Sequence, residues 1–140
     1  MIRLIVPGIP RPKARARIFT RGGKVMHYSP SAKDEQAFLA LAAHTRPIRP
    51  LEGLISVELT FYLPAPKTMP KKQRELVDRE GLPCAGRCDL DNLVKLAMDA
   101  LNRVYWKDDR QVCRLVARKV YSRTPRTELT VRDVGEGGKE

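Results

Sequence analysis

A run of strictly alternating side chains, residues 55–63, constrains the fold more than any other feature of the sequence. Serine, glutamate, threonine and tyrosine separate its apolar members, which are Ile55, Val57, Leu59, Phe61 and Leu63. Successive side chains of a strand point to opposite faces, so this period of two predicts a β-strand with one face in the core. The chain therefore contains a sheet, and other elements must cover the apolar face of this strand.

Further patterns predict the remaining elements. Residues 2–6, 112–121 and 127–133 are typical of strands, and Gly22-Gly23 indicates a hairpin turn between two short ones. Ser29-Pro30 is expected to start a helix that ends near Thr45, and KKQRELVDRE to form a short polar helix. We expect an α+β fold, a small mixed β-sheet packed with two main helices. One domain is expected over residues 1–134, with a flexible C-terminal tail at 135–140.

The second main helix is expected to begin near Asp91. Its apolar positions recur at helical spacing and comprise Leu93, Leu96, Ala97, Ala100, Leu101 and Val104. Asp91, Lys95 and Asp99 follow one another at intervals of four and fall on the opposite, polar face. This helix therefore presents charged groups to the surface while its other face enters the core.

The charge of the chain points to a polyanionic partner. Lys and Arg number 27 against 16 acidic residues, giving a formal net charge of +11 and a pI of about 10.0. Nucleic acid is the first candidate, and a solvated basic surface is the alternative. No apolar run approaches the roughly 20 residues that span a bilayer, and MIRLIVPG lacks the features of a signal peptide. Cysteines in an odd number indicate free thiols, so we expect a cytoplasmic protein without membrane contact.

The segment PRPKARAR is the strongest candidate for a DNA-binding element. Pro10 and Pro12 favour an extended backbone, which would place Lys13, Arg15 and Arg17 on one side. Such a row of cations suits a phosphate backbone. Two further arginines are added to this row: one lies between the two prolines and the other just before the acidic stretch. The expected DNA-binding residues are therefore Arg11, Lys13, Arg15, Arg17 and Arg87.

Acidic residues gather in two places in this basic chain. Asp89 and Asp91 stand at the expected helix start, where an extended entry would let both carboxylates point the same way. The plain alternative is a helix cap, with Asp91 and Lys95 as an ordinary ion pair. Asp108 and Asp109 follow the helix, and we expect the chain to turn back there and bring one of these carboxylates close to Asp89 and Asp91. Three carboxylates in one basic cleft would repel one another, and a hard divalent cation, for which we expect Mg²⁺, would relieve that repulsion.

The acidic motifs resemble those of a known family. The combination is Asp89-Leu90-Asp91-Asn92-Leu93, Lys95, Asp99-Ala100-Leu101, Trp106, Asp108-Asp109 and Gln111-Val112. It closely resembles the RusA-like Holliday junction resolvases, many of which are carried by prophages, and the resemblance extends from PGIPRPKARAR to the final strands. It implies a RusA-like fold and a homodimer that makes paired, magnesium-dependent nicks in four-way DNA junctions during recombination and repair.

The resemblance also implies roles for individual residues. Asp89, Asp91 and Asp109 would bind the metal, with Asp108 as the alternative to Asp109, and Lys95 would be the catalytic lysine. We expect Lys95 to stabilise charge on the attacked phosphate or to orient the water, and Asp99 to hold Lys95 in place.

Other features receive more ordinary interpretations. Cys84 and Cys88 with Cys113 or His27 would make a zinc site only if a second ligand pair were present, so free thiols are expected. Tyr105 and Trp106 are expected to anchor the helix end in the core or in a dimer contact. Two rival functions stay open from sequence: a non-catalytic basic protein that binds nucleic acid, and a metal nuclease that acts on other branched DNA or on RNA.

Overall fold

The computed structural model describes residues 1–14, 17–28 and 30–135, and the side chains of residues 17, 27, 28 and 43 lie outside that description. Its elements, in chain order, are β1 (Ile2–Pro7), β2 (Arg17–Arg21), β3 (Lys24–Tyr28), α1 (Ala32–Ala42), the 3-10 turn η1 (Ala43–Thr45), β4 (Leu54–Pro64), α2 (Lys71–Asp78), α3 (Leu90–Leu101), the 3-10 turn η2 (Asp109–Gln111), β5 (Val112–Ser122) and β6 (Arg126–Gly135). The α+β class expected from the sequence is confirmed.

Four strands form the main sheet in the order β1-β6-β4-β5. The strand β6 pairs antiparallel with both β1 and β4, whereas β4 and β5 run parallel. Parallel neighbours need a long crossover, and here it contains α2 and α3. The sheet is therefore mixed, as expected, and the crossover delivers the acidic helix α3 to one of its faces.

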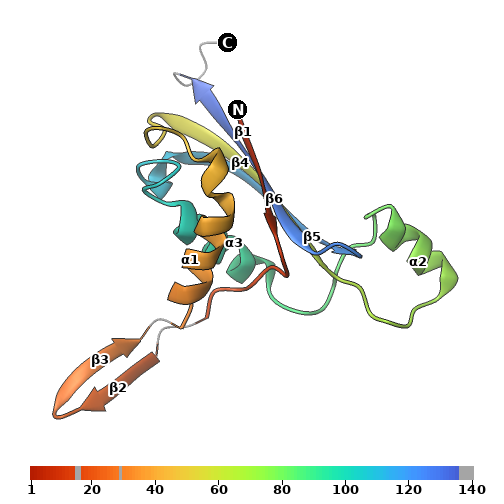
Figure 1. The fold of residues 1–140 in the computed structure, drawn as a ribbon, viewed down its shortest axis with the longest axis horizontal. Helices are drawn as coiled ribbons and strands as arrows, with labels where there is room; N and C mark the ends of the chain where they lie inside the picture. Colours follow the sequence, from red (N-terminus) through yellow and green to blue (C-terminus); the bar gives the residue numbers. More distant parts are fainter. Residues whose placement is uncertain (15–16, 29, 136–140) are drawn as a thin grey trace.

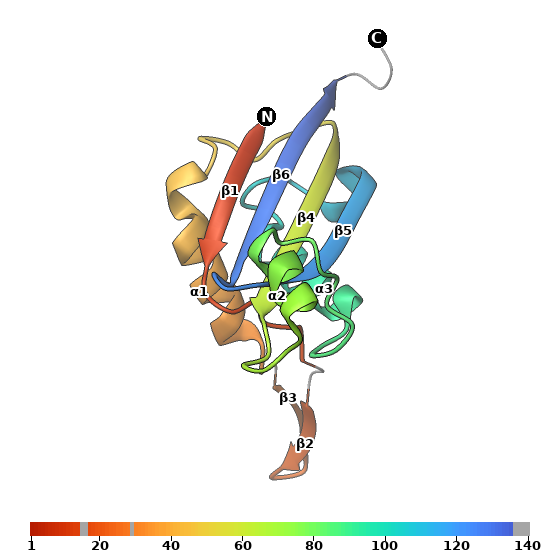
Figure 2. The same ribbon diagram turned by 90° about the vertical axis from the view of Figure 1, so that its right-hand side faces the viewer.

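Helices α1 and α3 lie side by side on one face of this sheet (Figures 1 and 2). The core between the helices and the sheet contains Leu59 and Phe61 from β4, Phe38 from α1, and Leu93 and Leu96 from α3. The strand predicted at residues 55–63 therefore points its alternating apolar side chains at the helices. The periodic stripe predicted from Leu93 to Val104 is buried as far as Leu101, where α3 ends, and Met98 joins it. Val104 lies in a turn beyond the helix and is half-buried.

The opposite face of β4 is less exposed than simple alternation predicts. Ser56 and Tyr62 are only 6% and 7% exposed, although they point away from the helices. The guanidinium of Arg126 lies 3.7 Å from the centre of the Tyr62 ring, and Arg114 donates a hydrogen bond to the Ser56 hydroxyl. Long side chains of the neighbouring strands thus contact this face of β4 near both of its ends, while Glu58 and Thr60 in its middle are half-buried.

The ends of several elements differ slightly from the sequence expectation. Helix α1 begins at Ala32 and passes into a 3-10 turn that ends at Thr45. The expected cap Ser29, Arg15 in the basic segment, and residues 136–140 of the expected tail lie outside the described residues. Within the described part of the chain, no helix has the length and apolar character required to cross a membrane.

The hairpin β2–β3 stands apart from these layers. Its two strands pair antiparallel around the turn at Gly22 and Gly23, both of which have positive φ. Figure 1 shows it projecting from the end of the molecule at which α1 begins. The predicted hairpin is therefore present, as an arm that projects away from the main sheet and its helices.

Candidate active site

The polar face of α3 carries the expected charged residues. Asp91 and Lys95 are exposed and Asp99 is half-buried, while Leu93 and Leu96 on the other side are 0% and 2% exposed. Burial of the apolar stripe fixes the rotation of the helix about its axis, so the three charged side chains must face outward. The amphipathic pattern therefore positions this part of the site.

Asp89 and Asp91 both keep carboxylate oxygens available at the start of α3. Asp89 is the N-cap residue and has an extended backbone, but its side chain accepts no capping hydrogen bond. The carboxylate of Asp91 accepts the adjacent N–H of Asn92 at 3.0 Å. The simple interpretation of Asp91 as the helix cap is wrong, because the N-cap position belongs to Asp89. Neither carboxylate is used to complete the helix end in the usual way.

The loop before Asp89 is tied down from two sides. Lys119 on β5 donates hydrogen bonds from its ammonium to the carbonyl oxygens of Gly86, at 3.0 Å, and Cys88. Arg87 has a φ of 79° and donates to the carbonyl of Pro64 at 3.1 Å. A left-handed backbone at a non-glycine residue persists only when the surroundings enforce it. The sheet thus helps to fix the backbone that precedes the first acid, and Arg87 remains exposed beside it.

Asp108 and Asp109 have different environments. Asp108 caps the 3-10 turn η2: its carboxylate accepts the N–H of Arg110 at 2.8 Å, and Gln111 completes a capping box. Asp109 instead accepts the indole N–H of buried Trp106 at 2.6 Å. One acid is therefore committed to local structure, and the other is oriented by an aromatic residue of the core.

Their pKa values move in opposite directions. Burial raises the pKa of Asp109, and the nearby charges of Asp99 and Asp108 raise it further, although the Trp106 hydrogen bond acts against them. The hydrogen bonds from the backbone and side chain of Arg110 lower the pKa of Asp108. Asp109 thus combines partial burial with crowding by other carboxylates, a combination that favours binding of a cation.

Lys13 connects the basic segment to the acidic helix. Its backbone N–H donates to the carbonyl of Asn92 at 2.8 Å, and its ammonium lies 2.9 Å from Glu35 and 3.1 Å from Asp99. Burial opposes its charge, but the hydrogen bonds with both carboxylates outweigh this effect and raise the pKa of Lys13. The expectation that Asp99 holds Lys95 is wrong, because Asp99 pairs with Lys13.

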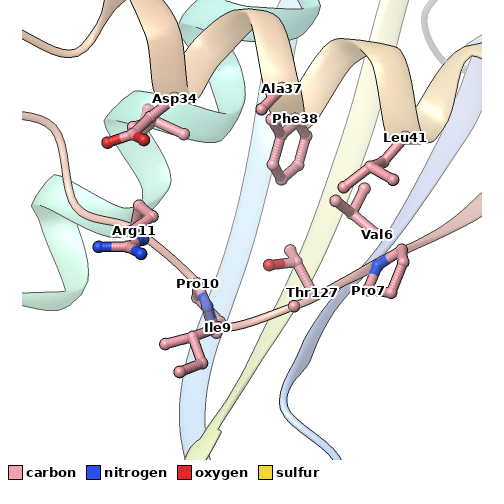
Figure 3. Close-up of a pocket in the computed structure, with 12 residues that line it drawn as sticks. Val6, Pro7, Ile9, Pro10, Arg11, Asp34, Ala37, Phe38, Leu41 and Thr127 are labelled. Atoms are coloured by element: carbon pink, nitrogen blue, oxygen red, sulfur yellow. The ribbon is translucent and has the colours of Figure 1, made fainter.

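The other basic candidates are placed as follows. Lys95 is exposed and forms no ion pair with another residue of the described ranges, so the ion pair with Asp91 in the plain alternative is absent there. Arg11 is exposed and lies with Asp34 at one end of an otherwise largely apolar cavity of about 290 Å³ (Figure 3). Arg17 begins β2, but its side chain is not described. Lys13 is held between acids, so the row of free cations expected along PRPKARAR is broken at its first member.

The donor chemistry of the acids fits a hard divalent cation, since carboxylate oxygens are the ligands that Mg²⁺ prefers. Among the described residues, however, no three His, Cys, Asp or Glu side chains form a group ready to hold an ion. Convergence of Asp89, Asp91 and Asp109 around one ion therefore stays a prediction. All three cysteines are free, and they make no zinc site with the described side chains.

Two structural contributions to the site were missed from sequence. One is Lys119, for which the sequence suggests no role. The other is the contact of Trp106 with Asp109, since Trp106 was expected only to be an anchor, and it is buried at 0% exposure. The spacing of Trp106 and Asp109 by three residues is the one local signal that would have suggested their contact. No comparable signal links Lys119 to the loop before Asp89, because that contact depends on the parallel pairing of β4 and β5.

The chain is similar to known proteins over most of its length. The family model described as Endodeoxyribonuclease RusA matches residues 7–132, which include all the acids discussed above. A Bacillus subtilis (strain 168) protein named "Uncharacterized protein YqaN" is 36% identical over 137 residues, covering 95% of this chain and 96% of its own length. The similarity thus spans nearly the whole described fold.

Proposed function

Because the chain belongs to the RusA family of endodeoxyribonucleases, we propose that it resolves four-way DNA junctions by paired, Mg²⁺-dependent nicks in recombination and repair. Membership makes the chain an endodeoxyribonuclease, an enzyme that hydrolyses DNA. The dependence on Mg²⁺, the pairing of the nicks and the cellular pathway are the proposed parts.

The observation that carries the proposal is the pair of uncommitted carboxylates at the start of α3. Asp89 occupies the N-cap position, but its side chain makes no capping hydrogen bond. Asp91 is exposed and lies one helical turn before Lys95. Acids that serve stability alone would be expected to cap the helix or to pair with the neighbouring lysine. In a chain of net charge +11, their availability favours a role in binding a cation next to DNA.

We propose that Asp89, Asp91 and Asp109 hold the ion. Mg²⁺ is commonly bound by one or two carboxylates together with substrate phosphate and water. Acids that form no closed cluster in the protein alone can therefore still bind the ion when DNA supplies a phosphate. When bound, the ion polarises a phosphoryl oxygen and lowers the pKa of a water molecule. Asp109 is preferred to Asp108 because Trp106 orients its carboxylate, whereas Asp108 is engaged at the start of η2.

Lys95 is the proposed catalytic lysine. Its ammonium is exposed on the same helical face as Asp91, one turn further along, and no ion pair with a described residue neutralises it. A free cation at this place can donate hydrogen bonds to a phosphate oxygen as negative charge accumulates there. Arg11 and Arg87, which are also exposed, are proposed to contact the DNA backbone on either side.

A homodimer is the proposed assembly. A four-way junction needs two nicks to be resolved, and a twofold dimer supplies two equivalent sites. Cytoplasmic location is likewise proposed, and the free state of Cys84, Cys88 and Cys113 supports it.

Nicking of a synthetic four-way junction tests the proposal, with a linear duplex and a flap of the same sequence as controls. Cleavage of the junction that requires Mg²⁺ is expected, and Asp91→Asn should abolish it. Binding of that variant should persist or tighten, because a negative charge near phosphate has been removed. Normal cutting by Asp91→Asn would refute the site. Binding without cleavage by the wild-type protein would favour a non-catalytic role, and preferred cutting of the flap would favour other branched DNA.

A further inference from the structure

The hairpin β2–β3 has two chemically different faces. Its register pairs Phe19 with Met26 and Arg21 with Lys24, and because side chains alternate, these four residues share one face. The opposite face contains the uncharged residues Ile18, Thr20 and Val25. One face therefore joins an aromatic ring and a thioether to two cations, and the other bears no charge among its described side chains.

The apolar side chains of this arm are exposed. Phe19 and Met26 are 45% and 41% exposed, and Ile18 and Val25 are 67% and 63% exposed. The two strands project from the body of the molecule and pack mainly against each other (Figures 1 and 2). An isolated two-stranded hairpin is only marginally stable in water. Exposed apolar groups on such an arm indicate that a partner covers it when the protein works.

The charge of the arm and its attachment favour DNA as that partner. The first acidic residue of the chain is Asp34, so the whole arm carries only positive charge. Just before it, Lys13 is bonded to the carbonyl of Asn92, and the N–H of Ala14 donates to the Ser31 hydroxyl at 2.7 Å. The first of these bonds attaches the root of the arm to the first turn of α3, beside Asp91, and the second attaches it to the residue before α1. DNA bound at the acids would therefore meet the arm as well.

We propose that the Phe19–Met26 face is a wedge that packs against unstacked bases at a DNA branch point, while Arg21 and Lys24 contact the flanking phosphates. Insertion of such a wedge into a continuous duplex requires a base step to be unstacked, whereas bases at a branch point can be unstacked at a lower cost. Apolar wedges between base steps and aromatic platforms for bases are common devices in DNA-binding proteins. This inference rests on the proposed function and deepens it, since it assigns the preference for branched DNA to the arm.

Fluorescence of 2-aminopurine tests the wedge. The probe is placed at the branch point of a four-way junction and at the same sequence position in a linear duplex, and binding is measured in EDTA so that no strand is cut. The variant carries Phe19→Ala and Met26→Ala, and the matched control carries Ile18→Ala and Val25→Ala on the opposite face. Thermal unfolding of both should match the wild type, because the arm lies outside the core.

The wild type should raise branch-point fluorescence on binding, and the wedge variant should lose that rise. Its affinity for the junction should fall by about 10-fold, as expected for the loss of base stacking, with its affinity for linear duplex unchanged. Replacement of Arg21 and Lys24 by alanine should weaken binding to both DNAs and reduce the salt slope by about 2. The control should behave as the wild type.

Two results would overturn the wedge. One is an unchanged fluorescence rise and affinity in the wedge variant. The other is loss of junction binding in the Ile18 and Val25 control together with a lower mass by sedimentation, which would show that a second copy of the chain covers the arm. If the protein still nicks junctions with Mg²⁺ in either case, the wedge alone fails. Absence of nicking by the wild type would instead refute the proposed function.

Discussion

The ammonium of Lys13 lies 3.1 Å from the carboxylate of Asp99 and also 2.9 Å from that of Glu35. Glu35 belongs to α1 and Asp99 to α3, so a single cation from the segment before the hairpin joins the two helices that cover the sheet. The bond from the Lys13 N–H to Asn92 adds a second attachment to α3. This residue therefore sets where the arm leaves the body of the molecule.

Removal of the Lys13 charge should destabilise the protein. In Lys13→Met, Glu35 and Asp99 lose a shared partner that is only 20% exposed. We expect the free energy of unfolding to fall by about 1–2 kcal/mol, since hydrogen bonds to charged groups in partly buried sites contribute this much. Urea denaturation measures the change. Lys33→Met on the exposed side of α1 is the control and should have little effect. Equal stability of the two variants would contradict the assigned role of Lys13.

Trp106→Phe should weaken the response to Mg²⁺ while preserving the fold. The substitution keeps an aromatic ring in the core but removes the N–H that orients the Asp109 carboxylate. Loss of a group that orients a metal ligand typically costs 10- to 100-fold in metal affinity or activity, so the Mg²⁺ concentration for half-maximal nicking should rise by roughly 10-fold. Titration of the nicking rate with Mg²⁺ tests this.

Tyr105→Phe is the control for the Trp106 variant. The Tyr105 hydroxyl is bonded to the Ala42 carbonyl and to Thr45, away from the acids. Its loss should lower stability and leave the Mg²⁺ requirement unchanged. A parallel change in both variants would mean that Trp106 acts only through general packing.

The neighbouring acids Asp108 and Asp109 should respond oppositely to replacement by asparagine. In the folded protein the pKa of Asp109 is raised by burial and by nearby carboxylates. Its ionised form is therefore destabilising above that pKa, and Asp109→Asn should stabilise the metal-free protein at neutral pH while abolishing nicking. Asp108→Asn should lower stability, because a capping carboxylate is lost, and should retain nicking. Thermal unfolding in EDTA and the junction assay measure both effects. Loss of nicking in Asp108→Asn alone would reverse the assignment of the third ligand.

Features with a local physical cause could be predicted from the sequence. The apolar stripe from Leu93 to Leu101 and the alternation from Ile55 to Leu63 each record which side of an element is buried, so the elements and their faces were predicted correctly. The Gly22-Gly23 turn was also predicted, since both residues adopt the positive φ that glycine permits. These signals lie within one element and do not depend on how the elements pack.

Contacts between elements could not be predicted in the same way. The parallel pairing of β4 with β5 brings Lys119 over the loop before Asp89, but nothing near Lys119 in the sequence indicates that partner. The pairing of Asp99 with Lys13 has the same cause, because it depends on the basic segment crossing α3. Sequence spacing suggested Lys95 as the partner of Asp99, and tertiary packing supplied a different cation. The candidate acids could thus be named from the sequence, whereas the contacts around them could not.

The cluster of Glu80 with Arg126 should make stability depend on pH. Arg126 donates two hydrogen bonds to Glu80, at 2.8 Å and 3.0 Å, and these bonds are the main reason that the pKa of Glu80 lies below its usual value. A lowered folded pKa means that the stabilisation is present above the unfolded value of about 4.3 and is lost as pH falls through the folded value.

Glu80→Gln should therefore reduce the free energy of unfolding at neutral pH by about 1 kcal/mol, a figure that allows for solvent screening of a partly exposed pair. The difference from the wild type should shrink below about pH 4, as the wild-type carboxylate becomes protonated. Urea denaturation across this pH range measures it, with Glu75→Gln on the exposed surface of α2 as the control. A difference that stays constant down to about pH 3 would show that Glu80 acts through its shape and hydrogen-bonding groups instead of its charge.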